Sequence, residues 1–467
     1  MVTKNNEELV KRIARLVRQN KELEEQLKVL HKKVENLSVE NEKLKAGNEK
    51  LISGRTSKEK MSSVTERSLK FDMVTVLFSD IHTDSILSEQ GDSASVMDEL
   101  DEILYEFDRI ALKYKIEKIK TIGDTFMCAG GIPVKNITNP VDVVMAALEM
   151  RTFLSDYESR KRPDGRKQWK FKVGIHTGPV NAAVKGKKKI RYDIKGDTVN
   201  SASRLEKISE KGLILISVMT YELVKEFFDC EYFGKLPVKY QGDLQVYRVK
   251  GLKNEFSADG RGAVPNDAFR IKFGLIRFTD IQETVLDRLE RELPSHLYYH
   301  NVKHTVDVVT EVELIGLAEG CSDEEILILK TAALFHDTGH TVSYEEHEYQ
   351  GTLIAREMLP EYDYTPDQIE LVCSLIMSTR LPPAPSSLLE EIICDSDLDY
   401  LGRSDFIPVS NSLFEELKAQ NKMGSLNEWN KLQVKFISGH QYFTRTARKL
   451  REVNKQQQIK RIKSLIS

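Results

Sequence analysis

The sequence lacks the features that would place the chain in a membrane, in an oxidising compartment or on nucleic acid. Its five cysteines are scattered with no Cys-x-x-Cys pair, which favours free thiols and a cytoplasmic location. No window approaches the roughly 18 apolar residues of a membrane span, and the N-terminus is charged rather than signal-like. Charge of one sign is also missing, because 69 Lys and Arg balance 72 Asp and Glu. We therefore predict a cytoplasmic protein with no membrane span and no nucleic-acid partner.

What is present divides the 467 residues into three regions, since one core does not extend over such a length. Region 1–52 carries a leucine at every seventh position. These leucines are Leu9, Leu16, Leu23, Leu30, Leu37, Leu44 and Leu51. Three residues before a leucine, the chain has Asn20, Asn41 and Asn48 among apolar residues. Leucine at position d with asparagine at some a positions predicts a parallel coiled coil, and hence a homodimer.

The other two regions differ in their patterns. After a polar linker at 53–69, residues 70–251 alternate strand-like and helix-like runs, which predicts an α+β sheet domain. A linker at 252–289 contains glycine and proline, and residues 290–467 are then helical almost throughout and end in a basic helix. Six of the ten histidines fall between 296 and 347, a concentration that packing does not explain.

Two pairs of polar residues in the α+β region suggest phosphate chemistry. Asp80 ends a strand in "FSD", and Asp124 follows a glycine in a turn. Carboxylates at the tips of neighbouring strands can bind a pair of Mg²⁺ ions. Asn200 and Arg204 lie four residues apart on one helical face, where an amide and a guanidinium suit the charge on a pentavalent phosphorus. Each signal is weak alone, because an Asp after Gly is usually a turn residue.

In combination, residues 70–251 closely resemble the class III nucleotidyl cyclase catalytic domain. The matching stretches are "FSDI", "IKTIGDTFM", "VGIHTGPV" and "YDIKGDTVNSASR". The resemblance implies a ferredoxin-like α+β fold with Asp80 and Asp124 as ligands of two Mg²⁺ or Mn²⁺ ions. It also implies that Asn200 and Arg204 stabilise the transition state.

The same resemblance assigns Lys120 and Asp193 to base recognition and places Lys239 near the β- and γ-phosphates. A lysine donor and an aspartate acceptor match adenine, whereas a glutamate in place of Lys120 would suit guanine. ATP is thus the expected substrate, with 3′,5′-cyclic AMP and pyrophosphate as products. In the family the metal-binding and base-reading residues come from different subunits, so a homodimer would contain two complete sites.

One loop departs from the family, whose first aspartate is usually followed by Ile-x-Gly-Phe-Thr. Here the chain has "DIHTDS", with Thr83 at the glycine position and Asp84 at the phenylalanine position. An additional negative charge beside a triphosphate is unfavourable. The alternative prediction is therefore a dimeric signalling scaffold that binds nucleotide without turnover and regulates the helical region.

The helical region contains a second set of ligand-type residues. His300 and His304 are four residues apart on one helical face, and "LFHDTGH" supplies His336, Asp337 and His340. Mixed imidazole and carboxylate ligands suit Mn, Fe, Zn or Mg with a water to activate. The pattern predicts a divalent-metal site.

Residues 293–406 resemble the HD-domain metal-dependent phosphohydrolases, which implies a helical bundle. The metal ligands carried over by motif are His304, His336, Asp337 and Asp397. Asp395 is the nearest competitor for the last position. The stretch "YHNVKHTVDV" also resembles the first motif of class I cyclic nucleotide phosphodiesterases, which implies that His300 is a general acid. A single ion, a second ion at His340 or His347, and a catalytically silent regulatory domain all remain open, as does the substrate.

Overall fold

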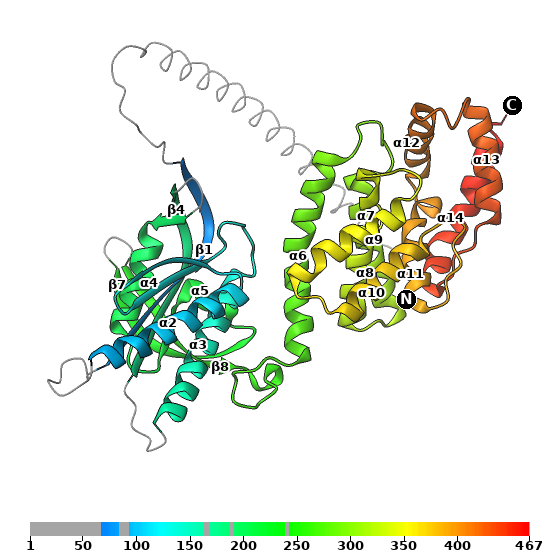
Figure 1. Ribbon diagram of the computed structural model, residues 1–467. Helices are drawn as coiled ribbons and strands as arrows, with labels where there is room; N and C mark the ends of the chain where they lie inside the picture. Colours follow the sequence, from blue (N-terminus) through cyan, green and yellow to red (C-terminus); the bar gives the residue numbers. More distant parts are fainter. Residues whose placement is uncertain (1–66, 84–92, 163–168, 186–190, 239–241, 467) are drawn as a thin grey trace, which may run out of the picture. The chain divides into compact units, whose positions relative to one another are not determined.

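The structure is a computed structural model that describes most of the chain after the first 66 residues. The described residues are 67–83, 93–162, 169–185, 191–238 and 242–466. The predicted coiled coil at 1–52 lies outside them, as do Asp84 and Lys239. An α+β region is followed along the chain by a helical region (Figure 1), which confirms the predicted fold classes of the second and third regions.

The α+β region is built on one sheet. In the described part of the chain its strands follow the order β2-β3-β1-β4-β6-β8-β7, and β5 pairs with β4. The strands are β1 (Arg67–Thr83), β2 (Glu117–Ile122), β3 (Thr125–Gly130), β4 (Trp169–Lys185), β5 (Arg191–Lys195), β6 (Ile214–Ser217), β7 (Phe228–Val238) and β8 (Gly242–Leu252). The pairing of β4 with β6 is parallel, and the other pairings recorded for this sheet are antiparallel. Strand β1 therefore lies between β3 and β4.

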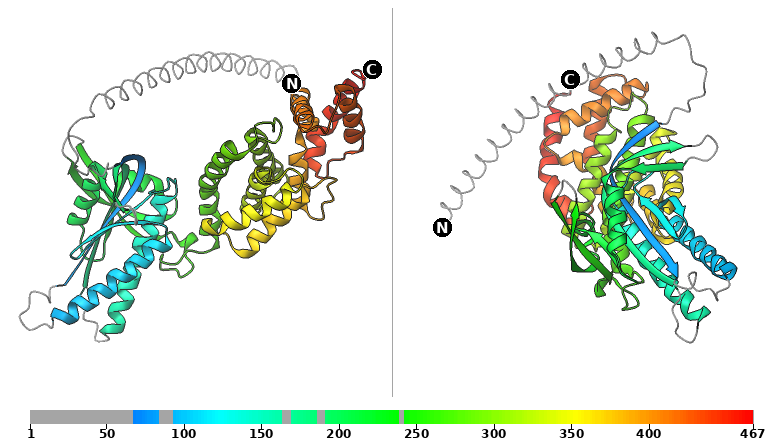
Figure 2. Two further views of the ribbon diagram at one scale, coloured as in Figure 1. Left: turned by 45° about the horizontal axis from the view of Figure 1, so that its top comes forward. Right: turned by 90° about the vertical axis from the view of Figure 1, so that its left-hand side faces the viewer.

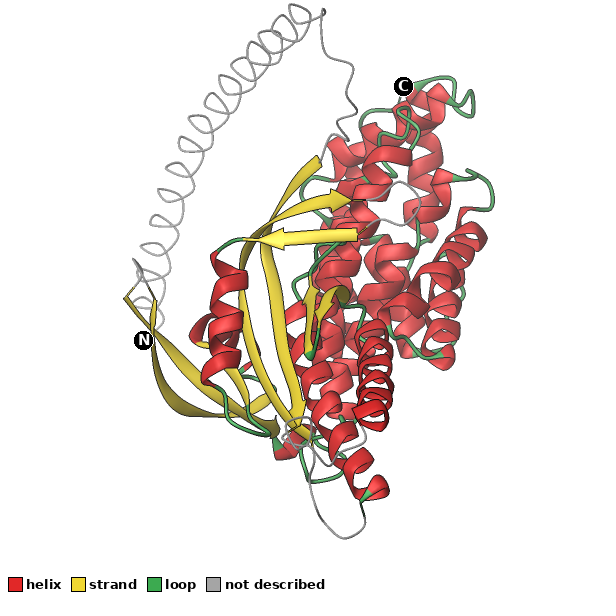
Figure 3. Cartoon of the chain, turned by 60° about the vertical axis from the view of Figure 1, so that its left-hand side comes forward, coloured by secondary structure: helices red, strands yellow, loops and turns green. Residues whose placement is uncertain are grey.

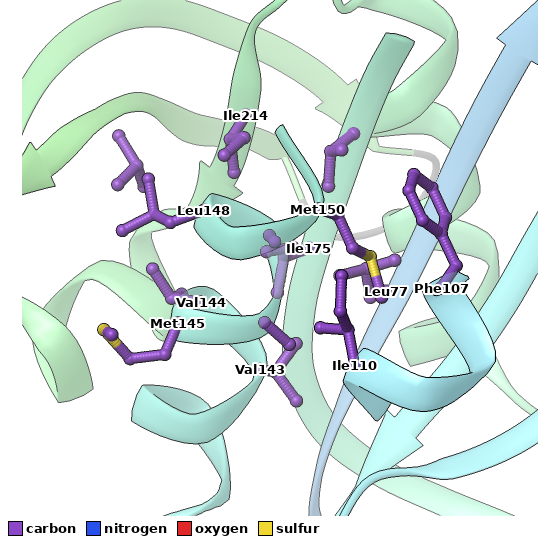
Figure 4. Close-up of a cluster of buried hydrophobic side chains, with 14 of the residues drawn as sticks. Leu77, Phe107, Ile110, Val143, Val144, Met145, Leu148, Met150, Ile175 and Ile214 are labelled. Atoms are coloured by element: carbon purple, nitrogen blue, oxygen red, sulfur yellow. The ribbon is translucent and has the colours of Figure 1, made fainter. Parts of the chain in front are cut away.

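Helices pack on both faces of this sheet (Figure 3). They are α2 (Ser93–Lys113), α3 (Asn139–Lys161), α4 (Asp197–Ile208) and α5 (Val218–Val224). Because side chains alternate along a strand, Leu77 of β1 faces the core with α2 and α3, whereas Val76 faces the cluster that includes Ala202 of α4. Figure 4 shows the first core, in which Leu77 lies near Phe107 of α2 and Met150 of α3. Helix α4 thus lies on the opposite face from α2 and α3.

The helical region has its own core of buried apolar side chains, and Figure 2 shows its helices from two further sides. Its α-helices are α6 (Asp267–Glu292), α7 (Val302–Glu319), α8 (Asp323–Phe335), α9 (His347–Met358), α10 (Pro366–Ser378), α11 (Leu388–Asp397), α12 (Phe406–Ala419), α13 (Leu426–Gly439) and α14 (Arg445–Lys463). Short 3₁₀ turns are η2 (Asn254–Phe256), η3 (Thr338–Thr341), η4 (Leu359–Tyr362) and η5 (Asp399–Gly402). Local signals define many of the ends, as in α8, where Ser322 and Glu325 form a capping box. None of the described helices is long and apolar enough to cross a membrane.

Two segments differ from the sequence prediction. Most of the predicted linker at 252–289 is occupied by α6, which begins after the N-cap Asn266. The first part of α6 belongs to the core of the sheet region through Phe269 and Phe273, and the rest belongs to the helical core. The predicted basic C-terminal helix is two helices, α13 and α14, and its charges are not all solvated, since Lys455 is buried and donates to the His440 carbonyl at 2.7 Å.

Candidate functional sites

The two acidic residues predicted at the sheet lie on adjoining elements. Asp80, near the end of β1, is opposite Thr125 of β3, and Asp124 immediately precedes that partner. The Ile81 amide donates to the Asp124 carbonyl at 3.1 Å, which fixes the turn against β1. His82 Nδ1 lies 3.0 Å from Asp80 Oδ2, because residues two apart on a strand share a face. The fold therefore brings both aspartates together and adds a histidine beside one of them.

Helix α4 carries the predicted amide and guanidinium. An added Cβ at Gly174 of β4 would lie 2.1 Å from the Glu206 nitrogen and 2.4 Å from the Ala202 carbonyl oxygen, so only glycine permits this packing distance. The opposite side of α4 is solvent-facing, and both Asn200 and Arg204 are exposed there. The side chains of Asn200 and Arg204 are therefore not buried in the core of this chain.

The buried end of α4 extends toward the acidic turn. Burial raises the pKa of Glu206, and the charges of Asp80 and Asp124 raise it further. Carboxylates that destabilise a neighbouring negative charge in this way form an environment that favours cations. The donor set of two aspartates therefore fits the hard divalent ions predicted from sequence.

The two predicted base-reading residues come from strands that contact each other. Lys120 lies on β2 and is exposed, and Asp193 lies on β5 and is half-buried. Strands β2 and β5 are in contact. Strand β2 alternates between half-buried and exposed residues, and Lys120 takes an exposed position.

In the helical region, four predicted ligands converge on one point. His304 Nε2 lies 3.1 Å from Asp397 Oδ1 and 3.4 Å from Asp337 Oδ2. His336 Nε2 lies 3.1 Å from Asp337 Oδ2, 3.5 Å from Asp397 Oδ1 and 3.4 Å from His304 Nε2. The four side chains come from α7, the end of α8 and the end of α11, and all are largely buried. All four predicted ligands thus come together within a single chain, and we name this group the HD cluster.

The surroundings of the HD cluster prepare it for a cation. His336 Nδ1 lies 2.8 Å from the Ala333 carbonyl, an interaction that leaves Nε2 to act as a ligand. Burial opposes charge on Asp337, but the positive charge of His336 outweighs burial and holds the pKa of Asp337 well below its usual value. Asp337 in turn raises the pKa of His336 well above its usual value, although burial alone would lower it. The carboxylates therefore stabilise positive charge strongly, as a cation site requires.

The two competing aspartates of α11 have different partners. Asp395 accepts hydrogen bonds from the Phe443 and Thr444 amides at 2.9 and 2.7 Å and from Thr444 Oγ1 at 2.7 Å. It therefore holds Thr444, the N-cap residue of α14, in place. Asp397, two residues further on, lies in the HD cluster.

A second group of histidines lies beside Asp337. His340 and His347 are stacked with ring centroids 4.0 Å apart, and their Nε2 atoms lie 3.8 and 3.6 Å from Asp337 Oδ1. Ligand atoms of His300, Asp337 and His340 lie within 4.8 Å of one another. Neither ring nitrogen of the buried His340 has a hydrogen-bond partner among the described residues. Such unpaired buried nitrogens fit a second metal position.

One residue at this site has no signal in the sequence. Glu416 of α12 is fully buried, accepts hydrogen bonds from the Tyr299 and His300 amides at 2.8 and 3.1 Å, and lies 2.5 Å from His300 Nδ1. Burial alone would lower the pKa of His300, but the Glu416 carboxylate outweighs it and raises that pKa. Glu416 thus fixes the orientation of His300. A cavity of about 80 Å³ beside His304 and Asp397 is lined in part by Lys303, Tyr400 and Arg403.

Comparison with protein families agrees with both sites. Residues 66–251 match the family "Adenylate and Guanylate cyclase catalytic domain", and residues 301–399 match the family "HD domain". The chain therefore carries a class III nucleotidyl cyclase domain followed by an HD phosphohydrolase domain.

Individual relatives cover the cyclase domain. The receptor-type guanylate cyclase gcy-8 of Caenorhabditis elegans is 37% identical over 191 residues, which cover 40% of this chain and 16% of that protein. Atrial natriuretic peptide receptor 2 of Homo sapiens is 34% identical over 190 residues, or 40% of this chain and 18% of that protein. This chain thus spans less than a fifth of the length of these two curated relatives.

Two solved structures are similar over the same region. The adenylyl cyclase CyaB from P. aeruginosa is 32% identical with a TM-score of 0.38, covering 41% of this chain and 100% of that chain. The guanylate cyclase domain of RhGC from Catenaria anguillulae in complex with GTP is 30% identical with a TM-score of 0.36, covering 40% of this chain and 100% of that chain. The names of these similar proteins include both adenylyl and guanylyl cyclases, so they do not define the nucleotide preference of this chain.

Proposed function

We propose that the protein is an adenylate cyclase that converts ATP to 3′,5′-cyclic AMP and pyrophosphate at a homodimer interface, with a second, metal-dependent phosphohydrolase activity. The observation that carries the choice of ATP is the contact between the strands of Lys120 and Asp193. A lysine donor and an aspartate acceptor complement the N1 and N6 positions of adenine, and guanine would leave both groups mispaired.

The single chain supports a site completed by a second copy. Asp80 and Asp124 would hold the divalent ions, which supply charge neutralisation for the reacting 3′-oxygen and the leaving pyrophosphate. Asn200 and Arg204 are exposed on α4 rather than directed into the chain's own core. In the homodimer, Arg204 of the partner subunit would donate hydrogen bonds to the phosphate oxygens as charge develops on them. Lys239 would bind the terminal phosphates.

The HD domain supplies the second activity. The HD cluster would hold one divalent ion, Asp337, His340 and His347 would hold another, and the metals supply an activated water. His300, with Glu416 at its Nδ1, would protonate the leaving oxygen from Nε2. We expect a phosphoester or phosphoanhydride substrate, with cyclic AMP and pyrophosphate as the first compounds to assay. Replacing His300 by alanine should lower phosphoester hydrolysis by roughly 100-fold or more, whereas replacing the exposed His296 should not.

Nucleotide profiling of the wild type and Lys120→Glu tests the cyclase proposal. The substitution should shift turnover from ATP toward GTP, because glutamate accepts where lysine donates. Lys118→Glu is the matched control: it makes the same charge change on β2, at a residue whose ammonium pairs instead with Asp108 at 2.6 Å. A Lys120→Glu enzyme with unchanged ATP preference would refute the base-reading assignment.

The alternative of a nucleotide-binding scaffold is favoured by one observation, the "DIHTDS" loop that puts Thr83 and Asp84 where the family has glycine and phenylalanine. In this version the dimer binds nucleotide and regulates the HD domain without cyclisation. Incubation of the full chain with Mn²⁺ and ATP separates the two functions, because formation of cyclic AMP excludes the scaffold.

A further inference from the structure

Helix α6 is a continuous helix shared by two cores. Its 26 residues extend over roughly 39 Å at 1.5 Å per residue. Phe269 and Phe273 near its start pack in the core of the cyclase domain, and Phe278, Ile281, Val285 and Leu289 pack in the core of the HD domain. An unbroken helix moves largely as one body, so a displacement at one end is passed to the other.

Midway along α6, a carboxylate holds the two residues that precede α3. The N-cap residue Thr138 makes no capping hydrogen bond with its own side chain. Instead Asp280 of α6, only 6% exposed, accepts from the Ile137 amide at 2.7 Å and from Thr138 Oγ1 at 2.9 Å. A carboxylate at this position neutralises the positive end of the α3 dipole. Arg277, one turn earlier on α6, donates to Asp142 in the first turn of α3 at 2.7 Å.

The segment that Asp280 holds is connected through β3 to the turn that contains Asp124. Residues 131–138 join the end of β3 to the start of α3, and β3 begins directly after Asp124. The next residue, Asn139, accepts from the Thr75 amide at 3.1 Å and from Thr75 Oγ1 at 2.6 Å, which ties it to β1, the strand of Asp80. A cavity of about 250 Å³, lined in part by Ile132, Pro133 and Arg277, adjoins this segment and gives it room to shift.

Helix α6 also packs against the elements that carry residues of the HD cluster and of the neighbouring histidine group. It contacts α8, which leads into His336, and it contacts η3, which contains His340. The α8 contact is close, because an added Cβ at Gly274 would lie 2.8 Å from Leu327 Cδ2. Tyr362, in η4, also donates to Thr284 of α6 at 3.1 Å.

We propose that Asp280 is a positioning residue through which α6 couples the nucleotide site of the cyclase domain to the metal site of the HD domain. Nucleotide binding between β2, β3 and their partners moves segment 131–138, Asp280 moves with its two donors, and α6 shifts against α8 and η3. By thermodynamic linkage, metal binding at the HD cluster alters nucleotide affinity by the same factor. The inference rests on the proposed function in that ATP is the ligand of the first site.

Hydrogen exchange of the full chain tests this coupling. The probe is 3′-deoxy-ATP with Mg²⁺, which lacks the hydroxyl needed for cyclisation, compared with Mg²⁺ alone. In the wild type, the nucleotide should slow exchange at amides 120–128 and change it at 336–341, by roughly fivefold or more if the coupling has a typical size. In Asp280→Asn the first effect should remain and the second should disappear.

Two variants accompany Asp280→Asn. Asp287→Asn is the matched control, because Asp287 lies two turns further along α6, is 65% exposed, and among the described residues forms an ion pair with Arg291 of the same helix. It should retain both effects. Thr138→Val removes one of the two donors to Asp280 from the opposite side and should weaken the distant effect, which keeps the test informative if Asp280→Asn fails to fold.

The outcomes separate the coupling from the proposed function. A nucleotide effect at 120–128 without any effect at 336–341 in the wild type overturns the coupling and leaves nucleotide binding intact. Persistence of the distant effect in Asp280→Asn overturns the role of Asp280. Absence of both effects in the wild type overturns nucleotide binding at this site, and with it the inference. A kinetic readout adds to this: His336→Ala should change the KM for ATP more than kcat in the wild-type background, and should not change it in Asp280→Asn.

Discussion

The HD site and the cyclase site differ in how closely a single chain brings their predicted residues together. In the HD domain, His304, His336, Asp337 and Asp397 lie within hydrogen-bonding or near-hydrogen-bonding distance of one another and are largely buried. In the cyclase domain, the comparable polar residues are spread over β1, β2, β5 and α4, and Lys120, Asn200 and Arg204 are exposed.

This difference indicates two ways of building a site. The residues of the HD cluster are buried when a single chain folds. Attraction between its imidazoles and carboxylates offsets the free-energy cost of removing them from water. The cyclase residues Lys120, Asn200 and Arg204 are exposed in the single chain, and in the proposed function a second copy of the chain covers them. We therefore expect single substitutions to damage the HD site within a chain, and damage at the cyclase site to be repaired by a second chain.

The largest expected effect is loss of metal from Asp337→Asn. Asp337 contacts His304 and His336 in the HD cluster and lies beside the second histidine group. Since losing a group that merely orients a ligand costs about 10- to 100-fold in metal affinity, losing this ligand should cost at least about 100-fold. Mn²⁺ titration calorimetry and metal analysis after dialysis measure it. Asp395→Asn is the control: it removes a buried carboxylate that holds the N-cap residue of α14, so it should lower stability while the folded protein keeps its metal.

The second prediction tests whether the cyclase site is shared. Asp80→Ala and Arg204→Ala should each abolish most cyclase activity. Mixed after subunit exchange, they should recover about a quarter of wild-type activity, because half of the dimers of a two-fold symmetric protein would be mixed and each mixed dimer would keep one intact site. Cyclic AMP formation measures the recovery. If the two folded, dimeric variants together remain inactive, each chain supplies its own complete site.

The sequence allowed the HD cluster to be predicted more fully than its surroundings. Adjacent His336 and Asp337 at a helix end restrict where the other ligands can lie. By contrast, the choice between Asp395 and Asp397 depends on which side of α11 faces α14, and this becomes visible only after tertiary packing. Glu416 lies 116 residues from His300, and no periodicity connects the two.

Helix α6 and Lys120 show two further limits of the sequence. The apolar residues of α6 belong to two different cores, so its pattern did not indicate a helix packed on one domain, and glycine and proline nearby suggested a linker. Lys120 lies at an exposed position of a strand that alternates in exposure, and its role was assigned by the resemblance to the cyclase family and not by the strand pattern. In the proposed function a second chain completes the cyclase site. Its residues are therefore exposed in the single chain, and the sequence does not distinguish them from ordinary surface charges.

A third prediction concerns the platform of the cyclase half-site. Gly174→Ala should destabilise the cyclase domain by roughly 3 kcal/mol, because the added Cβ meets backbone atoms of α4 that cannot rotate away. The substitution should also displace Asn200 and Arg204, so cyclase activity should fall while metal binding at the HD cluster persists. Urea unfolding measures the stability. Gly439→Ala, where an added Cβ meets nothing within 4 Å, should change stability by less than about 1 kcal/mol.

The smallest expected effect is a pH dependence confined to the HD domain. Burial lowers the pKa of His440 to about 4, and neither of its ring nitrogens has a hydrogen-bond partner in the described part of the chain. Because the unfolded chain binds a proton at higher pH than the folded one, this histidine leaves stability unaffected above about pH 6.5 and lowers it progressively as the pH falls toward 4. At pH 5 the loss should be roughly 1 to 2 kcal/mol. Denaturant unfolding at pH 7 and pH 5 should show a smaller difference for His440→Gln than for the wild type, whereas the exposed His296→Gln should behave as the wild type does. An equal pH dependence in all three proteins would mean that His440 is protonated as readily in the folded chain as in the unfolded one. The acid sensitivity would then come from other groups, such as His176 of β4, whose pKa burial lowers to about 4.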